Sequence, residues 1–403
     1  MTSVSAKYLK LIQNGLDVNW HESVTEEIKN ESIDGFMGML KKIRIQEKSG
    51  LEHRLILKVA PGDPALRIVR PITLVFNREY ETYSKILPEL ANFQAQHKIS
   101  APFTAFPQFY GGSTHEGKET ILMEDLTFKG FKCHEKYDDG MDFNHMSLMF
   151  KEYAKLHAAS LALGYKDPDK FKKLTSSIEE NIIRKVENED PKTFKILEQI
   201  VIDMGKRVVN GNKNADLAQK KYSEIFPEFW KTFLENSMEQ IFVISHGDCH
   251  PNNMFFLYKD CAKVNPQKMC LIDWQLSAKE TPIHDLSFAL FSSASKEALS
   301  RCDDLFRIYH KSLSQNLREF ECDPEQIFSY KDFQKHWKRH FLYGLYRGQM
   351  TLKLILMTLA QKEKAAKYKS LLDLMADDSL SSPKFIQRMQ DLFEILAENW
   401  LKN

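Results

Sequence analysis

IFVISHGDCHPNNMFF, residues 241–256, and KMCLIDWQ, residues 268–275, form the stretch of sequence that decides the fold. Each half contains a short apolar run next to polar residues of the kinds that carry chemistry. A polar loop separates the two halves. The remainder of the chain can be understood as the scaffold that surrounds this stretch.

The composition of this stretch predicts a β-hairpin. Residues 253–258 and 268–274 have the pattern of two strands, and the residues between them are typical of a turn. In an antiparallel pair of this length, Asn253 lies opposite Asp273 or its neighbour. We therefore expect both side chains at the open end of the hairpin, beside Asp248.

Asp248, Asn253 and Asp273 together suggest phosphoryl-transfer chemistry. Mg²⁺ takes few protein ligands besides water and phosphate oxygens, so an Asn amide oxygen and an Asp carboxylate on adjacent strands suit it. A second carboxylate on the preceding loop can orient an attacking hydroxyl and accept its proton. Each residue alone is typical of a turn or a strand end. Their order and spacing favour the functional interpretation.

HGDCHPNN followed by LIDWQ resembles the catalytic loop and metal-binding segment of the aminoglycoside phosphotransferase and choline kinase group, most closely its ecdysteroid kinase-like branch. The resemblance covers about residues 30–380. It implies a catalytic base at Asp248 and magnesium ligands at Asn253 and Asp273. It also implies an α+β, bilobal, protein-kinase-like fold, with an antiparallel sheet and a helix in the N-terminal lobe and a mostly helical C-terminal lobe.

The length of 403 residues and the 43% hydrophobic content suit two lobes with a sizeable core. A change to polar composition follows residue 126. We therefore expect an N-terminal nucleotide-binding lobe with a helical extension at 1–126. The C-terminal lobe at 127–403 is expected to hold the catalytic loop and the substrate pocket. Residues 5–31 have helical apolar spacing, and 101–112 are interpreted as a connector.

Lys58 is a candidate phosphate ligand in the N-terminal lobe. Strands are predicted at 41–46, 54–59 and 119–123. Side chains alternate along a strand, so Lys58 faces away from the side that carries Leu55, Leu57 and Val59. A solvated lysine on an edge strand is the ordinary alternative. A kinase-like fold, however, needs a lysine here that pairs with a glutamate on the next helix.

A helix is predicted over 72–90, because its apolar residues form one stripe. Glu79 borders that stripe and is the expected partner of Lys58, with Glu81 as its rival. The resemblance agrees, since its F-x-x-E-x-x-x-Y pattern matches Phe76, Glu79 and Tyr83 in this sequence.

The remaining nucleotide contacts are less specific. Gly35 and Gly38 leave room for backbone amides to approach phosphates, although a plain hairpin turn has the same pattern. The strand at 119–123 is expected to lead into a hinge. Backbone groups of Glu124 to Leu126 would bind adenine there, which any side chains permit.

The C-terminal lobe supplies support for the catalytic loop. His157 is expected to be a hydrogen-bonded core residue, and His246 the scaffold of the loop. Asp285 precedes an apolar helix and is interpreted as its N-cap; the resemblance implies that it also steadies the catalytic loop. Four aromatic residues could line a substrate pocket or belong to the core: Trp337, Phe341, Tyr343 and Tyr346.

Charge and composition exclude several other classes. Lys plus Arg total 56 and Asp plus Glu total 55, which gives no electrostatic case for nucleic-acid binding. The sequence shows neither a secretory signal nor an apolar run long enough for a membrane span. The six cysteines lack the spacing of a zinc module or a disulfide framework. We expect a cytoplasmic protein without a membrane partner; the sequence carries no signal of oligomeric state.

The resulting hypothesis is an ATP- and Mg²⁺-dependent kinase that transfers the γ-phosphoryl group to a hydroxyl of a small molecule. The resemblance suggests a steroid-like or other lipophilic alcohol as the acceptor. Choline-type or aminoglycoside-type phosphotransferase activity is an alternative, and so is a catalytically silent protein that binds nucleotide or ligand. A protein kinase is disfavoured because Gly247 replaces the arginine of the H-R-D motif.

Overall fold

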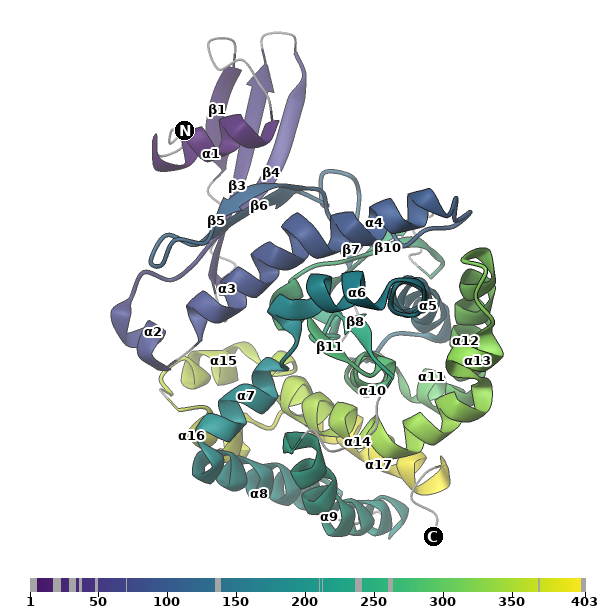
Figure 1. Cartoon of the computed structure of the whole chain (residues 1–403). Helices are drawn as coiled ribbons and strands as arrows, with labels where there is room; N and C mark the ends of the chain where they lie inside the picture. Colours follow the sequence, from purple (N-terminus) through teal and green to yellow (C-terminus); the bar gives the residue numbers. More distant parts are fainter. Residues whose placement is uncertain are drawn as a thin grey trace.

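The computed structural model shows two lobes, with a sheet-rich lobe above a larger helical lobe (Figure 1). The α+β, bilobal architecture expected from the sequence is therefore confirmed. No helix among the described residues has the length and apolarity needed to cross a membrane. The structure describes residues 6–16, 23–28, 34–35, 38–47, 50–69, 71–134, 139–209, 211, 213–235, 241–259, 264–368 and 370–399.

The N-terminal lobe contains an antiparallel sheet with the strand order β1-β3-β4-β6-β5, and a short strand β2 that pairs with β3. Side chains of β3 and β4 alternate between the two faces of the sheet, so each face packs against a different part of the molecule. The strands are β1 (Ser23–Ile28), β2 (Asp34–Gly35), β3 (Gly38–Glu47), β4 (Glu52–Val59), β5 (Phe109–Ser113) and β6 (Thr120–Glu124).

Helix α1 (Ala6–Leu16) covers the outer face of this sheet (Figure 1). Tyr8 and Ile12 are buried in a small apolar core with Leu55, Leu57 and other residues of the sheet. Gly15 permits the approach, because a Cβ atom there would lie 2.2 Å from the carbonyl oxygen of Tyr110 in β5. The sheet thus has apolar contacts on both faces.

A long helical segment crosses the inner face of the sheet, after the short helix α2 (Pro64–Val69). It consists of α3 (Ile72–Glu81), a π-helical turn η2 (Thr82–Ile86) and α4 (Leu87–Gln96). Pro88 explains the π turn, since proline has no N–H to donate to the carbonyl of Ser84. The N–H of Leu87 donates to the carbonyl of Thr82, five residues earlier, which is the hydrogen bond of a π-helix.

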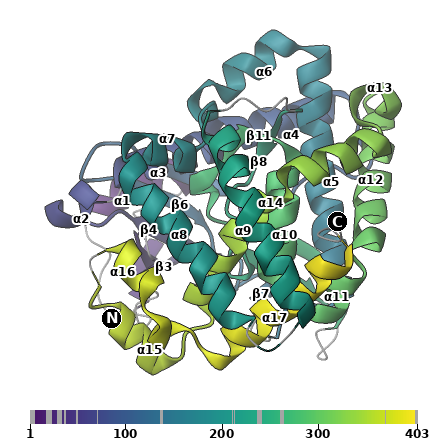
Figure 2. The ribbon, with the colours of Figure 1, turned by 90° about the horizontal axis from the view of Figure 1, so that it is seen from below.

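The C-terminal lobe is a layered bundle of helices, seen from below in Figure 2. Its central helices α5, α10 and α14 carry the side chains that hold the catalytic loop. The helices are α5 (Phe143–Lys166), α6 (Pro168–Thr175), α7 (Ile182–Glu189), α8 (Pro191–Val208), α9 (Lys213–Leu234), α10 (Pro282–Ser293), α11 (Lys296–Ser300), α12 (Cys302–Glu319), α13 (Pro324–Phe328), α14 (Tyr330–Ile355), α15 (Leu359–Ala365), α16 (Leu371–Ala376) and α17 (Pro383–Asn399), with 3₁₀ turns η3 (Ser176–Ile178) and η6 (Asp378–Leu380).

Two small antiparallel sheets frame the stretch that decides the fold. The predicted hairpin is present, with Met254 opposite Leu271, so Asn253 faces the neighbour of Asp273 as expected. Both Asn253 and Asp273 therefore lie at its open end. The elements are β8 (Val243–Ser245) with β11 (Ala278–Glu280), and β10 (Pro266–Leu271) with β9 (Met254–Tyr258) and β7 (Lys132–Cys133), plus the turns η4 (Pro251–Asn253) and η5 (Trp274–Leu276).

Two expectations about elements are wrong. Residues 23–28 form a strand and not part of a helix, because their backbone pairs with β3. Residues 109–113, interpreted as connector, form β5, whose two glycines allow a register shift against β6. Trp20 lies outside the described residues.

Candidate active site

Lys58 lies where the two lobes meet. Its Nζ atom is 2.6 Å from Glu79 Oε2 in α3 and 2.7 Å from Asp273 Oδ1 in the C-terminal lobe. Burial disfavours its charge, but the two carboxylates outweigh that effect and raise the pKa of Lys58 above its ordinary value. The lysine is therefore a permanent cation held between carboxylates of different lobes.

Glu79 and not Glu81 is the partner of Lys58. Glu79 is fully buried, whereas Glu81 pairs with Lys85 one turn further along the helix. Burial, only partly offset by Lys58, raises the pKa of Glu79 to about 7. The neighbouring Arg78 also connects the lobes, because its Nη1 atom donates to the carbonyl of Ser277 at 3.1 Å.

Asp273 has left-handed backbone angles, with φ and ψ both 64°. This conformation is uncommon for a residue with a side chain and is found where surrounding structure holds the backbone in place. Asp273 follows the end of strand β10 by two residues, and its carboxylate contacts Lys58. The N–H of Ile272 donates to the carbonyl of Asn253 at 3.1 Å, so the metal-ligand candidates lie on adjacent backbone segments.

Asn253 is oriented by the catalytic loop. Its Nδ2 atom donates to the backbone carbonyl of Asp248 at 3.1 Å and to Asp248 Oδ2 at 3.2 Å. The amide nitrogen makes these contacts, which turns the Oδ1 oxygen to the opposite side. A carboxylate from Asp273 and this amide oxygen are hard oxygen donors, and they fit Mg²⁺.

Asp248 lies at the end of the loop that precedes the hairpin. One carboxylate oxygen is 3.3 Å from Arg347 Nη2 in α14, and the other is 3.6 Å from His250 Nε2. Burial opposes its charge, yet His250 and Arg347 hold the pKa of Asp248 well below its usual range. Asp248 is therefore ionised at neutral pH.

His246 links the catalytic loop to the hairpin. Its Nε2–H donates to the carbonyl of Ile272 at 2.9 Å, and its Nδ1 accepts from the N–H of Asp248 at 3.3 Å. Burial lowers the pKa of His246, so the ring is neutral. This geometry agrees with a scaffold role.

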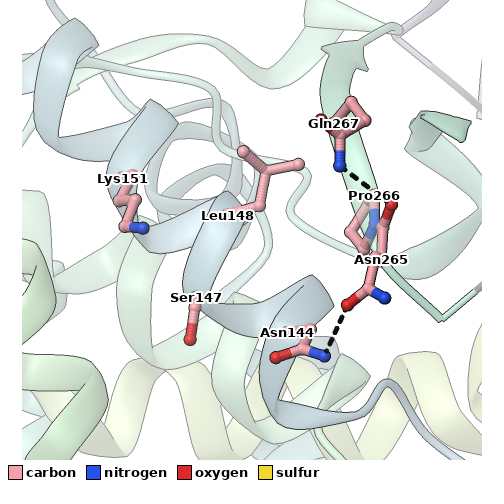
Figure 3. A pocket seen from close by; sticks show the side chains of 7 residues that line it. All are labelled: Asn144, Ser147, Leu148, Lys151, Asn265, Pro266 and Gln267. Atoms are coloured by element: carbon pink, nitrogen blue, oxygen red, sulfur yellow. Dashed lines mark hydrogen bonds between the residues drawn. The ribbon is translucent and has the colours of Figure 1, made fainter. Parts of the chain in front are cut away.

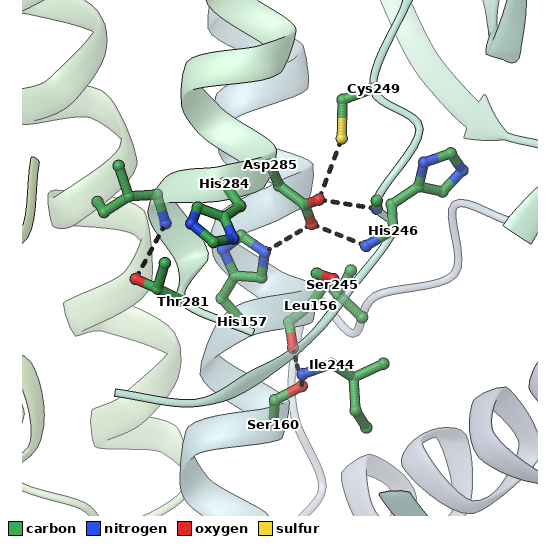
Figure 4. A network of polar contacts seen from close by, with 12 residues as sticks. Leu156, His157, Ser160, Ile244, Ser245, His246, Cys249, Thr281, His284 and Asp285 are labelled. Carbon is green, nitrogen blue, oxygen red and sulfur yellow. Dashed lines mark hydrogen bonds and ion pairs between the residues drawn. The ribbon is translucent and has the colours of Figure 1, made fainter. Parts of the chain in front are cut away.

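Asp285 anchors the same loop from α10 (Figure 4). Its carboxylate accepts the N–H groups of His246 at 2.8 Å and Gly247 at 2.9 Å, and it also contacts Cys249 Sγ. His157 completes the network, since its ring bridges Asp285 and the Tyr309 hydroxyl. His157 is thus the hydrogen-bonded core residue that the sequence predicts.

The N-cap prediction for Asp285 is wrong. Thr281 caps α10 by accepting the N–H of Ile283, and Pro282 begins the helix. Asp285 therefore lies inside the first turn, where its side chain faces the catalytic loop. The loop-steadying role that the resemblance implies has its hydrogen bonds in this structure.

Gly35 and Gly38 pair across a tight hairpin whose two central residues lie outside the described part of the chain. A Cβ atom at Gly38 would lie 3.1 Å from both the Phe76 ring and the carbonyl oxygen of Val59. Close packing is therefore a reason for glycine at 38 that does not involve a nucleotide.

The backbone at the expected hinge is partly engaged. The N–H of Glu124 donates to the carbonyl of Gln108, and the carbonyl of Leu126 accepts from Lys129 and Phe131. The carbonyl of Glu124 and the N–H of Leu126 are the candidate groups for contacting an adenine. These two groups are separated by one residue on the same segment.

The four aromatic candidates divide into two pairs. Trp337 and Phe341 pack against Phe291 in the core of the lobe. Tyr343 lies beside Arg347, and Tyr346 packs on Trp230 at a ring distance of 4.3 Å. Only the second pair neighbours the residues that contact Asp248.

Two cavities in the C-terminal lobe lie away from these residues. One of about 230 Å³ lies between the start of α5 and the β9–β10 connection, where Asn144 donates to Asn265 (Figure 3). The other, of about 580 Å³, lies along α8. None of the predicted site residues lines either cavity.

Sequence reasoning missed Arg347. It lies 99 positions after Asp248, on a helix with no motif that marks it, and only its spacing from Gly344 and Gly348 is distinctive. Its contact with Asp248 depends on how α14 packs against α10, which the sequence alone does not define.

The chain has two stacked lobes, a Lys–Glu pair between β4 and α3, and an adjoining loop that carries Asp248. These features define a protein-kinase-like fold. Within that class, the chain belongs to the ecdysteroid kinase-like family, whose sequence model matches residues 32–322. The resemblance drawn from the HGDCHPNN and LIDWQ motifs is thereby confirmed.

Two solved structures of glucosamine kinase are similar to this chain. One, in complex with glucosamine, ADP and inorganic phosphate, has 11% identity and a TM-score of 0.40, with 88% of this chain and 84% of that chain covered. The other, crystal form B, has 10% identity and a TM-score of 0.36, with 95% and 81% covered. No curated protein matches the chain.

Proposed function

We propose that this protein is an ATP-dependent small-molecule kinase that transfers the γ-phosphoryl group to a hydroxyl. One observation carries the proposal. Lys58 of the N-terminal lobe joins Glu79 and Asp273, while Asn253 connects Asp273's hairpin to Asp248. The candidate phosphate ligand, the two metal-ligand candidates and the candidate base therefore lie close together, which supports the proposal. Membership of the ecdysteroid kinase-like family supports the same activity.

On the nucleotide side, Lys58 would bind the α- and β-phosphates, with Glu79 holding it in place. Gly35 and Gly38 would lie near the phosphates, and adenine would bind the carbonyl of Glu124 and the N–H of Leu126. Asn253 and Asp273 would hold Mg²⁺, which supplies neutralisation of phosphate charge. This division supports a lobe boundary near residue 126.

On the acceptor side, Asp248 would orient the hydroxyl and take its proton. Arg347 neutralises Asp248, and burial raises the pKa of nearby Glu187 to about 8, so that this carboxyl is largely protonated at pH 7. Arg347 therefore offsets the charge of Asp248, and Glu187 adds little negative charge near neutral pH. Together with Tyr343 and the Phe288 ring, this favours a steroid-like or other lipophilic alcohol over choline or an aminoglycoside.

The test is a transfer assay with Mg²⁺, ATP and a panel of sterols, aliphatic alcohols, choline and aminoglycosides, followed by mass spectrometry for the gain of one phosphate. We expect transfer to neutral alcohols and a loss of at least about 100-fold in D248N, because positioning and charge supply most of the rate. Wild-type rates in D248N would contradict the assignment.

A thermal-unfolding measurement with ATP separates an enzyme from a silent binder. ATP should raise the unfolding temperature more with Mg²⁺ than without it, and D273N should lose the Mg²⁺-dependent part. Stabilisation by ATP alone, together with no transfer to any acceptor, would instead identify a silent nucleotide-binding protein.

A further inference from the structure

Arg347 contacts Asp248 Oδ1, the carboxylate oxygen that Asn253 does not contact, and the proposed reaction so far gives it no task. Its Nη2 atom is 3.3 Å from Asp248 Oδ1, and only 12% of its side chain is exposed. It lies in α14, beyond residues 32–322 that the family model matches.

The packing of α14 holds this guanidinium in one position. A Cβ atom at Gly344 would lie 2.2 Å from the carbonyl carbon of Ser287, so glycine lets α14 approach α10 closely. The guanidinium lies over the Phe288 ring at 4.6 Å, and Nη1 donates to the Tyr343 hydroxyl at 3.3 Å. Two neighbours besides Asp248 therefore fix its orientation.

An acceptor hydroxyl must come within about 2.6–3.2 Å of Asp248 to hand over its proton. A hydroxyl at that distance from Oδ1 can lie on the side of this oxygen where Arg347 Nη2 also reaches it, because Nη2 borders the same carboxylate oxygen. The hydroxyl oxygen can then donate to Asp248 and accept from Arg347 at once. A fixed donor aimed at the place where negative charge develops lowers the barrier without reorganising during the reaction.

We propose that Arg347 is a further catalytic residue that donates a hydrogen bond to the acceptor oxygen as this oxygen loses its proton to Asp248. The inference rests on the proposed kinase function. In the step, the acceptor O–H bond breaks and the proton passes to Asp248. The oxygen forms a bond to the γ-phosphorus, and the bond from that phosphorus to the β–γ bridging oxygen breaks, with its electron pair leaving on ADP.

The test compares R347Q and R347K with the wild-type chain at saturating ATP. We expect R347Q to lower kcat by about 100-fold or more, the usual cost of one such donor. R347K, which keeps the charge but loses the fork, should fall between R347Q and wild type. The KM for ATP and the stabilisation by Mg²⁺ and ATP in thermal unfolding should stay unchanged, since Arg347 is on the acceptor side.

R388M is the matched control, because Arg388 is also a buried arginine but bonds the Ala294 carbonyl between α10 and α11. It should keep the wild-type kcat. If R347Q keeps wild-type kcat, or if its loss lies wholly in the KM for the acceptor, the inference is overturned while the kinase function stands. If the wild-type chain transfers nothing, both fall together. Should R347Q fail to fold, a wild-type kcat in R347K overturns the inference.

Discussion

Lys58 is a cation that carboxylates from both lobes contact. The stability and charge of the site therefore depend on single residues. An ion pair that is removed from water depends on both partners, because a lone buried charge is costly. The same charge in an exposed pair contributes little. Glu79 and Glu81, two positions apart on one helix, allow this contrast to be measured directly.

E79A should destabilise the protein by about 3 kcal/mol, because it leaves Lys58 with Asp273 alone in a buried setting. E81A should change stability by less than about 0.5 kcal/mol, since the Glu81–Lys85 pair is largely exposed. Urea unfolding of the two variants checks the difference. Equal losses would contradict the assignment of Glu79 as the buried partner.

Glu187 predicts a pH dependence of stability. Its carboxyl accepts from Trp230 Nε1 at 2.7 Å, and burial raises its pKa from 4.5 to about 8. A raised pKa contributes stability that is complete below pH 4.5 and is lost as pH rises to about 8. E187Q does not titrate, so its stability relative to wild type should rise by a few kcal/mol from about pH 5 to pH 8, at up to about 1.4 kcal/mol per pH unit.

Urea unfolding of the E187Q variant and the wild-type chain at both pH values checks this slope. The glutamine keeps an oxygen for Trp230, so loss of that hydrogen bond does not complicate the comparison. A difference in stability that stays constant across the two pH values would show that Glu187 is ionised in the folded chain.

Residues that belong to a local motif could be predicted from the sequence, and residues that act across the fold could not. Asp248, Asn253 and Asp273 stand within 26 positions, and one hairpin relates them. Glu79 follows from the helix after Lys58. Arg347 has no such local relation, because its place beside Asp248 depends on the contact between two helices. The roles of all these residues stay predictions until they are assayed.

At the scale of elements, helix α10 carries the residue that anchors the catalytic loop, and helix α14 carries the arginine that contacts Asp248. Asp285 on α10 holds the catalytic loop, and Arg347 on α14 contacts Asp248. Gly344 and Gly348 face α10, where any Cβ atom would be within 2.2 and 3.1 Å of it. The distance between these two helices therefore controls where Arg347 lies.

G344A should destabilise the protein by about 2–3 kcal/mol, because the added Cβ meets the backbone of Ser287, which cannot move aside without shifting the helix. G164A is the control within α5. A Cβ there meets only the Phe171 ring at 3.6 Å, so higher helix propensity should leave stability unchanged or raise it by up to about 1 kcal/mol. Thermal unfolding of both variants measures the contrast, and equal effects would refute it.

Long periodic elements could be predicted, while short ones with mixed signals could not. The helix at 72–90 and the strands at 41–46, 54–59 and 119–123 are present because their apolar spacing was regular. Strand β5 was missed, since Phe109, Tyr110 and two glycines lack alternation and gain their pairing only from β6. The π turn follows from Pro88 but has no signature in apolar periodicity.

At the scale of the whole molecule, α3 is the principal connection between the lobes. Its Glu79 orients Lys58 toward Asp273. Its Arg78 donates to the carbonyl of Ser277, which lies four positions after Asp273 in the C-terminal lobe. The inner face of the N-terminal sheet is therefore tied to the site, whereas the outer face depends on α1 for cover. The inner face therefore contributes to the site, and the outer face contributes to the stability of the N-terminal lobe.

I12A should destabilise the N-terminal lobe by about 2–4 kcal/mol, because Ile12 is fully buried between α1 and the sheet. K10A on the exposed side of α1 should change stability by less than about 0.5 kcal/mol. Hydrogen exchange of β3 and β4 amides checks the effect. Unaltered protection of these strands in I12A would mean that α1 does not stabilise the sheet.

The contact between α1 and β5 also has a consequence for protein synthesis. Gly15 packs on Tyr110, so the first helix meets a strand that emerges about 90 residues later. At about 5–20 residues per second, β5 is made roughly 5–20 seconds after α1, so the Gly15 contact forms well after α1 can begin to pack on β3 and β4. Codons that slow translation between residues 17 and 108 should therefore lower the yield of folded chain, and nascent-chain chaperones should raise it.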